Sequence, residues 1–514
     1  MLGANAAPLT GAAERPTLVV GIVVEGLDEN YLNLLADKFG TGGFRKLLEN
    51  SAIIEQLDYG TFLDAQAATA LLYTGSAPIV NGIPAAKTYE VWRNASRPTL
   101  TDSLEIGNFT TSTLSPRKLL VSTLADEIKI DGSGATHSYA IAADPQQAII
   151  MAGHASNGGY WIDDINGQWA STTFYGDVPQ TISLRNYNNR LSTRLDTMQW
   201  RPLLSSMLAY PDIPSTRVPA PFRYQFQSGD PDRYRKFKAS PSANTEITDL
   251  ATELIHYQML GQHPGVDMLS VAYSLAPYPY SLYADQRVET MDSYLRLDRD
   301  LEKLFKAVDA RKGNGSTLIF LAGIPARTSS KADDERWKVP TGQFSARKAK
   351  SLLNMYLMAI HGNGEWVSGY HDRNFYLNHN LIKEHKLDAK TVREQAAQFL
   401  NRMSGVSHAY TIDDVLAARV GSNPNALRRN TSPEHSGDVI ISVNPGWEAV
   451  DDLGGGDNYL SRDSHTPSML FIMGPGVTPT RITEAVDARR ISPTIARLLR
   501  IRSPNSASEP AVRF

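Results

Sequence analysis

The hydrophobic pattern of the chain alternates between short apolar runs and longer amphipathic stretches. Thr17 to Glu25 is a continuous apolar run that ends in an acid, which is typical of a parallel strand buried on both faces. Similar runs occur at Ser138 to Ala143, Asp267 to Ser274 and Ser316 to Ala322, and helical periodicity covers Val288 to Val308. This alternation predicts an α/β fold, in which a mostly parallel central sheet is flanked by helices.

Two stretches interrupt this pattern. Residues from about 161 to 241 are rich in Asn, Tyr, Ser, Pro and Arg, and those from about 333 to 417 contain two further helical segments. We interpret both stretches as cap insertions into one domain that spans residues 15–514 and follows a flexible N-terminus, residues 1–14. The strand pattern resumes at Asp438 to Val443 and at Ser468 to Met473, and both are predicted to join the central sheet.

Composition narrows the function classes. A net charge of -3 leaves no basic footprint for nucleic acid, and no stretch approaches the ~20 apolar residues of a membrane span. The chain has no cysteine, which removes disulfides and thiolate zinc sites. The small residues from Met1 to Pro8 fit either the mature end of an exported chain whose signal peptide is not part of this sequence or a flexible native N-terminus. We therefore expect a periplasmic or exported protein.

Several motifs occur in the order that one enzyme family shows. They include RPTLVVGIVV at 15–24, GGFRKLL at 42–48, YTG at 73–75, SPRKLLV at 115–121 and DSHTP at 463–467. On these motifs the chain resembles the alkaline phosphatase superfamily, and within it the periplasmic, phosphate-irrepressible alkaline phosphatases of the type I phosphodiesterase/nucleotide pyrophosphatase branch. The resemblance implies an alkaline-phosphatase-like sandwich with a Thr or Ser nucleophile between two zinc ions.

The residues that this resemblance places in the site do not carry that chemistry. The nucleophile position holds Ala65, the phosphate-contacting Asn falls at Ala86, and the two cationic clamp positions hold Asp144 and Gln146. The metal-ligand positions hold Glu25, Pro277, Ser281, Ile324, Pro325 and Gly456. No histidine lies between His263 and His361, the interval that should supply two metal-binding loops, so no register shift restores a two-zinc site. We expect no zinc and no other cofactor.

The leading interpretation is a catalytically inactive, metal-free pseudoenzyme that acts as a periplasmic binding or scaffold component, with another envelope protein as its partner. The segment PYPYSLY at 277–283 stands where a metal-ligand loop would be. Tyrosine is favoured at interfaces, so Tyr278, Tyr280 and Tyr283 form a candidate binding surface. The alternative for these rings is that they fill the emptied cleft.

Two other functions stay open. The first is a metal-dependent phosphoric-ester hydrolase with a remodelled site, in which oxygen ligands hold Ca²⁺ or Mg²⁺. Its candidate ligands are Glu25, Asp64, Asp451, Asp452 and Asp457. The second is an envelope-glycan binder that uses the aromatic residues of the first insertion, Tyr160, Trp161, Trp169 and Tyr175. Ester turnover with bound metal would indicate the first, and glycan binding the second.

Overall fold

A large mixed sheet with a parallel centre organises the main body of the protein. The computed structural model describes residues 14–60, 63–213, 218–283, 285–311, 317–326, 340–419, 422–453, 458–461 and 468–514. The strand order is β21-β2-β20-β12-β1-β11-β6-β7-β8-β5, and β12, β1, β11, β6 and β7 run parallel to one another. These five strands are β12 (Thr317–Ile324), β1 (Leu18–Glu25), β11 (Asp267–Ser274), β6 (Ser138–Ala142) and β7 (Gly158–Ile162). The predicted α/β fold is confirmed.

Antiparallel strands extend the sheet on both sides. On one side β20 (Ser468–Met473) pairs with β12 and with β2 (Ala52–Asp58). On the other side β8 (Trp169–Thr172) pairs with β7 and with β5 (Gly107–Asn108). The outermost strands β21 (Thr480–Ile482) and β22 (Val486–Asp487) pair with β2.

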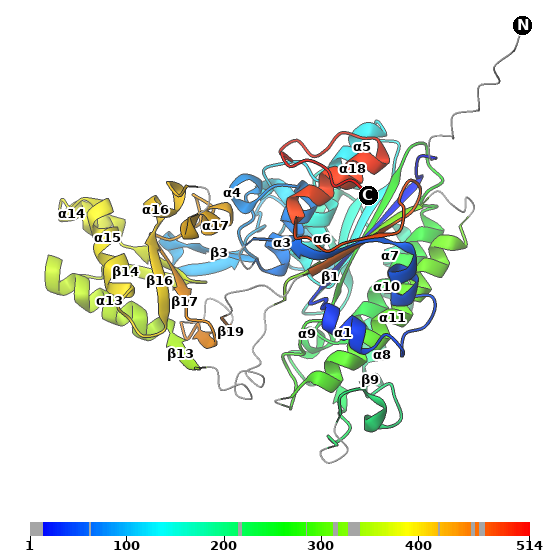
Figure 1. Cartoon of the computed structure of the whole chain (residues 1–514), viewed down its shortest axis with the longest axis horizontal. Helices are drawn as coiled ribbons and strands as arrows, with labels where there is room; N and C mark the ends of the chain where they lie inside the picture. The colour runs from blue at the N-terminus through cyan, green and yellow to red at the C-terminus, as the bar shows by residue number, and fades with distance from the viewer. Residues whose placement is uncertain are drawn as a thin grey trace, which may run out of the picture.

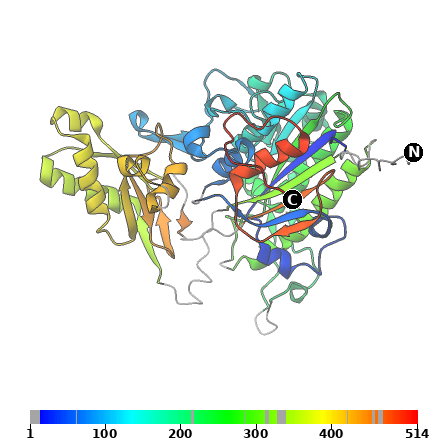
Figure 2. The same cartoon turned by 45° about the horizontal axis from the view of Figure 1, so that its top comes forward.

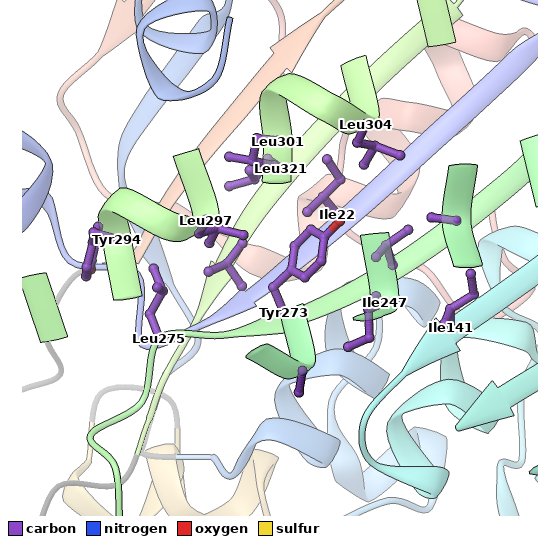
Figure 3. Packing of buried hydrophobic residues seen from close by; sticks show 14 of the residues in the cluster. Ile22, Ile141, Ile247, Tyr273, Leu275, Tyr294, Leu297, Leu301, Leu304 and Leu321 are labelled. Atoms are coloured by element: carbon purple, nitrogen blue, oxygen red, sulfur yellow. The ribbon is translucent and has the colours of Figure 1, made fainter. Parts of the chain in front are cut away.

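Helices cover both faces because the central strands are apolar on both. In β1, Val20, Ile22 and Val24 join one hydrophobic cluster, and Val19 and Val23 join the other. Figure 3 shows the first cluster, where Leu297, Leu301 and Leu304 lie over the sheet. The helices of this face are α1 (Glu29–Leu34), α2 (Phe44–Asn50), α10 (Pro241–Tyr257) and α11 (Arg287–Asp309). The opposite face carries α3 (Ala65–Thr74), α5 (Leu124–Asp131), α6 (Pro145–Ala152) and α18 (Ile491–Leu499).

The first predicted insertion extends the main body. Its aromatic residues Trp200, Tyr210 and Phe237 belong to the same hydrophobic cluster as Ile22. Its elements are α7 (Gln180–Asn188), α8 (Leu191–Leu195), the pair β9 (Gln199–Trp200) and β10 (Tyr224–Gln225), and α9 (Arg233–Lys238).

The second insertion builds a lobe with a hydrophobic cluster of its own, seen at the left of Figures 1 and 2. One sheet has the order β14-β15-β17-β16, with β14 (Val367–His371), β15 (Asn374–Leu377), β16 (Val406–Thr411) and β17 (Val439–Val443). A second contains β13 (Gly342–Ser345), β18 (Trp447–Val450) and β19 (Tyr459–Leu460). The lobe helices are α13 (Ala346–His361), α14 (His379–Glu384), α15 (Ala389–Leu400), α16 (Ile412–Leu416) and α17 (Asn423–Arg429).

The prediction that residues 438–443 join the central sheet is wrong. β17 pairs instead with β15 and β16, so the lobe continues past residue 417 to β19. The prediction for residues 468–473 is confirmed by β20.

A hairpin from the main body reaches the lobe. It consists of β3 (Lys87–Glu90) and β4 (Ala95–Pro98), and it follows the short helix α4 (Pro78–Asn81). The rings of Tyr89 and Tyr376 have centroids 4.5 Å apart, which joins the hairpin to β15 (Figure 1). Among the helices that the structure describes, none has the length and apolar character needed to span a bilayer.

Candidate functional site

The candidate site begins where three parallel strands end. Glu25 closes β1 and stands in register with Ser274 of β11 and Ile324 of β12. The amide of Leu275 donates to the Glu25 carbonyl at 2.7 Å, and the amide of Gly26 donates to the Ile324 carbonyl at 2.9 Å. Glu25 is thereby fixed at the carboxyl edge of the sheet, where open α/β folds bind their ligands.

The Glu25 carboxyl is partly buried and electrostatically unusual. Ser274 Oγ donates to its Oε2 at 3.1 Å. Burial raises the pKa of Glu25 to about 7, the Ser274 hydrogen bond opposes the rise, and the negative charges of Asp144 and Asp64 add to it. A carboxyl that exchanges its proton near neutral pH suits general acid–base chemistry.

Asp64 and Asp144 are held by the helices that they cap. Asp64 Oδ1 accepts from the amide of Ala67 at 2.9 Å at the start of α3, and its Oδ2 accepts from the amide of Ala86 at 2.6 Å. Asp144 Oδ1 accepts from the amide of Gln147 at 2.9 Å at the start of α6. Capping explains why both carboxylates keep fixed places near Glu25.

The positions predicted to have lost the nucleophile and the phosphate clamp form part of the framework. The buried side chain of Gln146 accepts from the amide of Leu100 at 2.9 Å and donates to the Ala86 carbonyl at 2.7 Å. The carbonyl of Ala65 accepts from Thr69 Oγ1 at 2.6 Å. At Ala65, Ala86 and Gln146 the structure therefore places hydrogen bonds that involve backbone groups, and no nucleophilic side chain.

The predicted metal-ligand positions hold packing residues. Ile324 and Pro325 are buried. Ser281 Oγ donates to Glu289 Oε1 at 3.0 Å, and Tyr224 OH donates to the same oxygen at 2.9 Å. Across the described ranges no group of three or more His, Cys, Asp or Glu side chains is arranged to hold a metal ion. These side chains do not fit a two-zinc centre. Gly456 and Asp457 lie outside the described residues.

The acids predicted to share the cleft are only partly brought together. Asp452 lies in the lobe, where its Oδ2 accepts from Ser345 Oγ at 2.6 Å and its Oδ1 from the amide of Arg347 at 2.7 Å. Asp451 is the residue before Asp452 and directly follows the end of β18. The charges acting on the Glu25 carboxyl are those of Asp144 and Asp64.

Ser274 is the site residue that sequence analysis missed. It closes the apolar run of β11 as Glu25 closes that of β1, and this shared ending was the available signal.

The three tyrosines of the predicted binding surface differ in how deeply they are buried. Tyr278 is only 4% exposed and packs against Trp200, with ring centroids 5.1 Å apart, so its ring offers no contact surface. Tyr280 is partly buried, and the Lys236 ammonium lies 5.6 Å from its ring centroid. Tyr283 is exposed. A binding role for Tyr280 and Tyr283 stays a prediction.

The aromatic residues predicted to bind glycans are mostly core residues. Tyr160, Trp161 and Trp169 are buried, and Trp169 Nε1 donates to Glu246 Oε1 at 3.1 Å. Tyr175 is partly buried, and its hydroxyl donates to the Gly153 carbonyl at 2.8 Å. The glycan-binding prediction is wrong because three of its four rings are not accessible.

Comparison with known proteins places the chain in one family. The family model described as type I phosphodiesterase / nucleotide pyrophosphatase matches residues 19–468. A protein of Myroides odoratus named calcium-transporting ATPase is 28% identical, over 96% of this chain and 93% of that protein. Alkaline phosphatase PhoV of Synechococcus elongatus is 26% identical, over 96% of this chain and 92% of its own length. Alkaline phosphatase PafA of Elizabethkingia meningoseptica is 26% identical, over 99% of this chain and 95% of its own length.

The fold agrees with a solved relative. The crystal structure of wild-type alkaline phosphatase PafA superposes with a TM-score of 0.86, covering 98% of this chain and 99% of that one at 23% identity. The predicted alkaline-phosphatase-like sandwich and the resemblance to the superfamily are confirmed.

The comparisons contradict the prediction of an inactive binding or scaffold protein. Two relatives that match nearly the whole chain are named alkaline phosphatases. The alternative prediction, a phosphoric-ester hydrolase with a remodelled site, agrees better with these relatives.

Proposed function

Because the chain belongs to the type I phosphodiesterase / nucleotide pyrophosphatase family, we propose that it hydrolyses phosphoric esters in a remodelled site centred on Glu25. One observation carries the proposal. Glu25 combines a pKa of about 7 with a fixed place at the carboxyl ends of three parallel strands. Perturbed carboxyls at such an edge are candidates for acid–base catalysis.

The proposed reaction uses water as the nucleophile, since Ala65 offers none. Ionised Glu25 accepts a proton from the attacking water while the water oxygen forms the new bond to phosphorus. The bond between phosphorus and the ester oxygen breaks, and the proton passes on to the departing alcohol. A single displacement of this kind inverts the configuration at phosphorus and forms no covalent intermediate.

The charge of the site favours substrates with little negative charge. Asp64 and Asp144 already act on Glu25 with negative charge. A phosphate monoester dianion is repelled by these carboxylates more strongly than a diester with one charge. We therefore propose phosphodiesters as the preferred substrate class.

The place of action is a further part of the proposal. We propose that the protein works in the periplasm or outside the cell. The absence of cysteine from all 514 residues supports this, because stray thiols are a liability in an oxidising compartment.

The proposal is tested by measuring turnover of bis(p-nitrophenyl) phosphate and p-nitrophenyl phosphate by the purified chain. Each substrate is assayed with a chelator and with added Mg²⁺, Ca²⁺ or Zn²⁺, since the metal requirement is open to measurement. We expect the diester to be the better substrate. Absence of turnover of either ester under every metal condition would overturn the proposed function.

A further inference from the structure

The proposed site depends on a strand end that has a neighbouring strand on one side only. β11 ends at Ser274, which pairs with Glu25 of β1. On the other side, β6 pairs with β11 from Met268 to Val271 and then leaves the sheet toward α6. The register that β6 follows would place Asp144 opposite Ser274, but this residue caps α6 instead. Ser274 therefore lies beyond the last backbone pairing that the structure describes between β6 and β11.

The backbone groups of Ser274 point toward this open side. Neighbouring residues of a strand within a parallel sheet direct their amide and carbonyl groups to opposite sides. Leu275 donates its amide to the Glu25 carbonyl at 2.7 Å, so Ser274 directs its own amide and carbonyl away from β1. Figure 3 shows Tyr273 and Leu275, the two neighbours of Ser274 in the chain. Backbone groups left unpaired in the protein interior cost free energy, so Ser274 needs a partner on this side.

Asn244 supplies this partner. Its Oδ1 accepts from the Ser274 amide at 3.1 Å, and its Nδ2 donates to the Ser274 carbonyl at 2.8 Å. The side chain is only 3% exposed and comes from near the start of α10. A side-chain amide carries the same donor and acceptor as a peptide group, so Asn244 takes the place of a further β6 residue. Asparagine is a poor helix former, so helix propensity does not account for its place in α10.

The Ser274 side chain connects this contact to Glu25. Ser274 Oγ accepts from the Ala276 amide at 3.2 Å and donates to Glu25 Oε2 at 3.1 Å. Because Oε2 is engaged in this way, Oε1 is the oxygen that remains for the proton of the attacking water in the proposed reaction. A hydroxyl at a strand end keeps its direction only while its own backbone is held in place.

We propose that Asn244 is a positioning residue for the proposed hydrolysis. It holds the backbone of Ser274, and through Ser274 Oγ it orients the Glu25 carboxyl toward the attacking water. Its effect on turnover rests on the proposed function, whereas its effect on the contact between Ser274 and Glu25 does not.

The chain contains a matched control for this contact. Asn186 Oδ1 accepts from the Trp169 amide at 2.8 Å, and its Nδ2 donates to the Trp169 carbonyl at 2.8 Å. Asn186 is 6% exposed, and Trp169 begins β8, which lies four places from β1 in the sheet. Replacing either asparagine by leucine removes the partner of a backbone amide and a backbone carbonyl. Asn186, however, holds a strand that is remote from Glu25.

Steady-state kinetics with bis(p-nitrophenyl) phosphate test the proposal, under the metal condition that gives the unchanged chain its highest turnover. We expect Asn244→Leu and Ser274→Ala each to lower kcat about tenfold and to change KM by less than about twofold, because orientation and not substrate binding is lost. The double variant should be no slower than the slower single variant, since both changes remove one function. Asn186→Leu should lower the urea midpoint of unfolding as Asn244→Leu does, but it should retain kcat.

Crystal structures of the unchanged chain and of Asn244→Leu give a second readout that needs no turnover. We expect Ser274 Oγ to move beyond hydrogen-bond distance, about 3.5 Å, from Glu25 Oε2 in the variant. An unchanged contact would overturn the proposal, and so would equal kcat losses in Asn244→Leu and Asn186→Leu or multiplied losses in the double variant. Unchanged kcat in Ser274→Ala would overturn it even if Asn244→Leu fails to fold. If the contact is lost but the unchanged chain hydrolyses no ester, Asn244 still positions Ser274 and the proposed function alone fails.

Discussion

The buried environment of Glu25 has two opposing consequences. It suits the carboxyl to proton transfer, and it destabilises the charged form of the same carboxyl. Its folded pKa of about 7 lies above the ordinary value of 4.5, with burial as the largest cause. A carboxyl whose pKa is raised by folding contributes its full stability below about pH 4.5 and loses it as the pH rises through 7. The site therefore keeps a residue that weakens the fold at the pH where it would act.

Replacing this carboxyl should stabilise the protein only at higher pH. We expect Glu25→Gln to raise the free energy of unfolding by about 1–3 kcal/mol at pH 8 and to change it little at pH 4, at about 1.4 kcal/mol for each pKa unit. Urea denaturation at both pH values measures this difference. An equal effect at both pH values would show that the pKa of Glu25 is not raised.

Single residues also show what the sequence could reveal about the site. Glu25 was predicted correctly as the acid that ends the first strand, since its place follows from a local pattern. Ser274 was missed because its partnership with Glu25 depends on strand pairing between residues 249 positions apart. The contact between His371 and Lys87 could not be predicted, because these residues meet only when the lobe packs on the β3–β4 hairpin.

At the scale of elements, the capping of α3 connects helix stability to the chemistry of Glu25. Asp64 caps this helix and also accepts from the amide of Ala86, so it fixes the segment that follows α4. Its charge contributes to the raised pKa of Glu25.

Asp64→Ala should therefore have two effects. Loss of the cap should lower the free energy of unfolding by about 1–2 kcal/mol. Loss of the negative charge should lower the pKa of Glu25, so the rising limb of kcat/KM against pH should move to lower pH. Ser345→Ala, which removes the cap of α13 in the lobe, is the matched control and should leave the pH profile in place. A limb that stays in place for Asp64→Ala would show that Asp64 does not act on Glu25.

The sequence predicted strands and their sheet correctly where continuous apolar runs lie between the two helical layers of the main body. Continuous apolar runs identified β1, β11 and β12 because these strands are buried on both faces. The same kind of run at β17 was assigned to the wrong sheet, since Val439, Ile440 and Ile441 are equally buried between β15 and β16 of the lobe. Hydrophobic periodicity reports burial and does not report which sheet provides it.

At the scale of the whole molecule, the two insertions differ in what they bury. The first joins the main hydrophobic cluster, whereas the second forms a separate one. This difference explains why aromatic residues of the first insertion are structural although the sequence suggested a binding surface.

Two tryptophans test whether the aromatic residues of the first insertion are core residues. Trp169→Ala removes a buried ring and its hydrogen bond to Glu246, and should cost about 3–5 kcal/mol of unfolding free energy. Trp92→Ala removes a ring that is 76% exposed in the β3–β4 connection. This substitution should change the free energy of unfolding by no more than about 0.5 kcal/mol. Similar unfolding midpoints in denaturant for the two variants would contradict the assignment of Trp169 to the core.

The central claim is that Glu25 carries ester hydrolysis, and one comparison of turnover tests it most directly. Asp300 supplies a matched control, because this carboxyl is 5% exposed on α11, has its pKa raised to about 7 by burial, and accepts from Thr245 Oγ1 at 3.0 Å. Diester turnover is measured for the unchanged chain, Glu25→Gln and Asp300→Asn. We predict that Glu25→Gln loses about 100-fold or more in kcat/KM, as expected for loss of a general base, while Asp300→Asn retains activity. Full activity in Glu25→Gln would contradict the account.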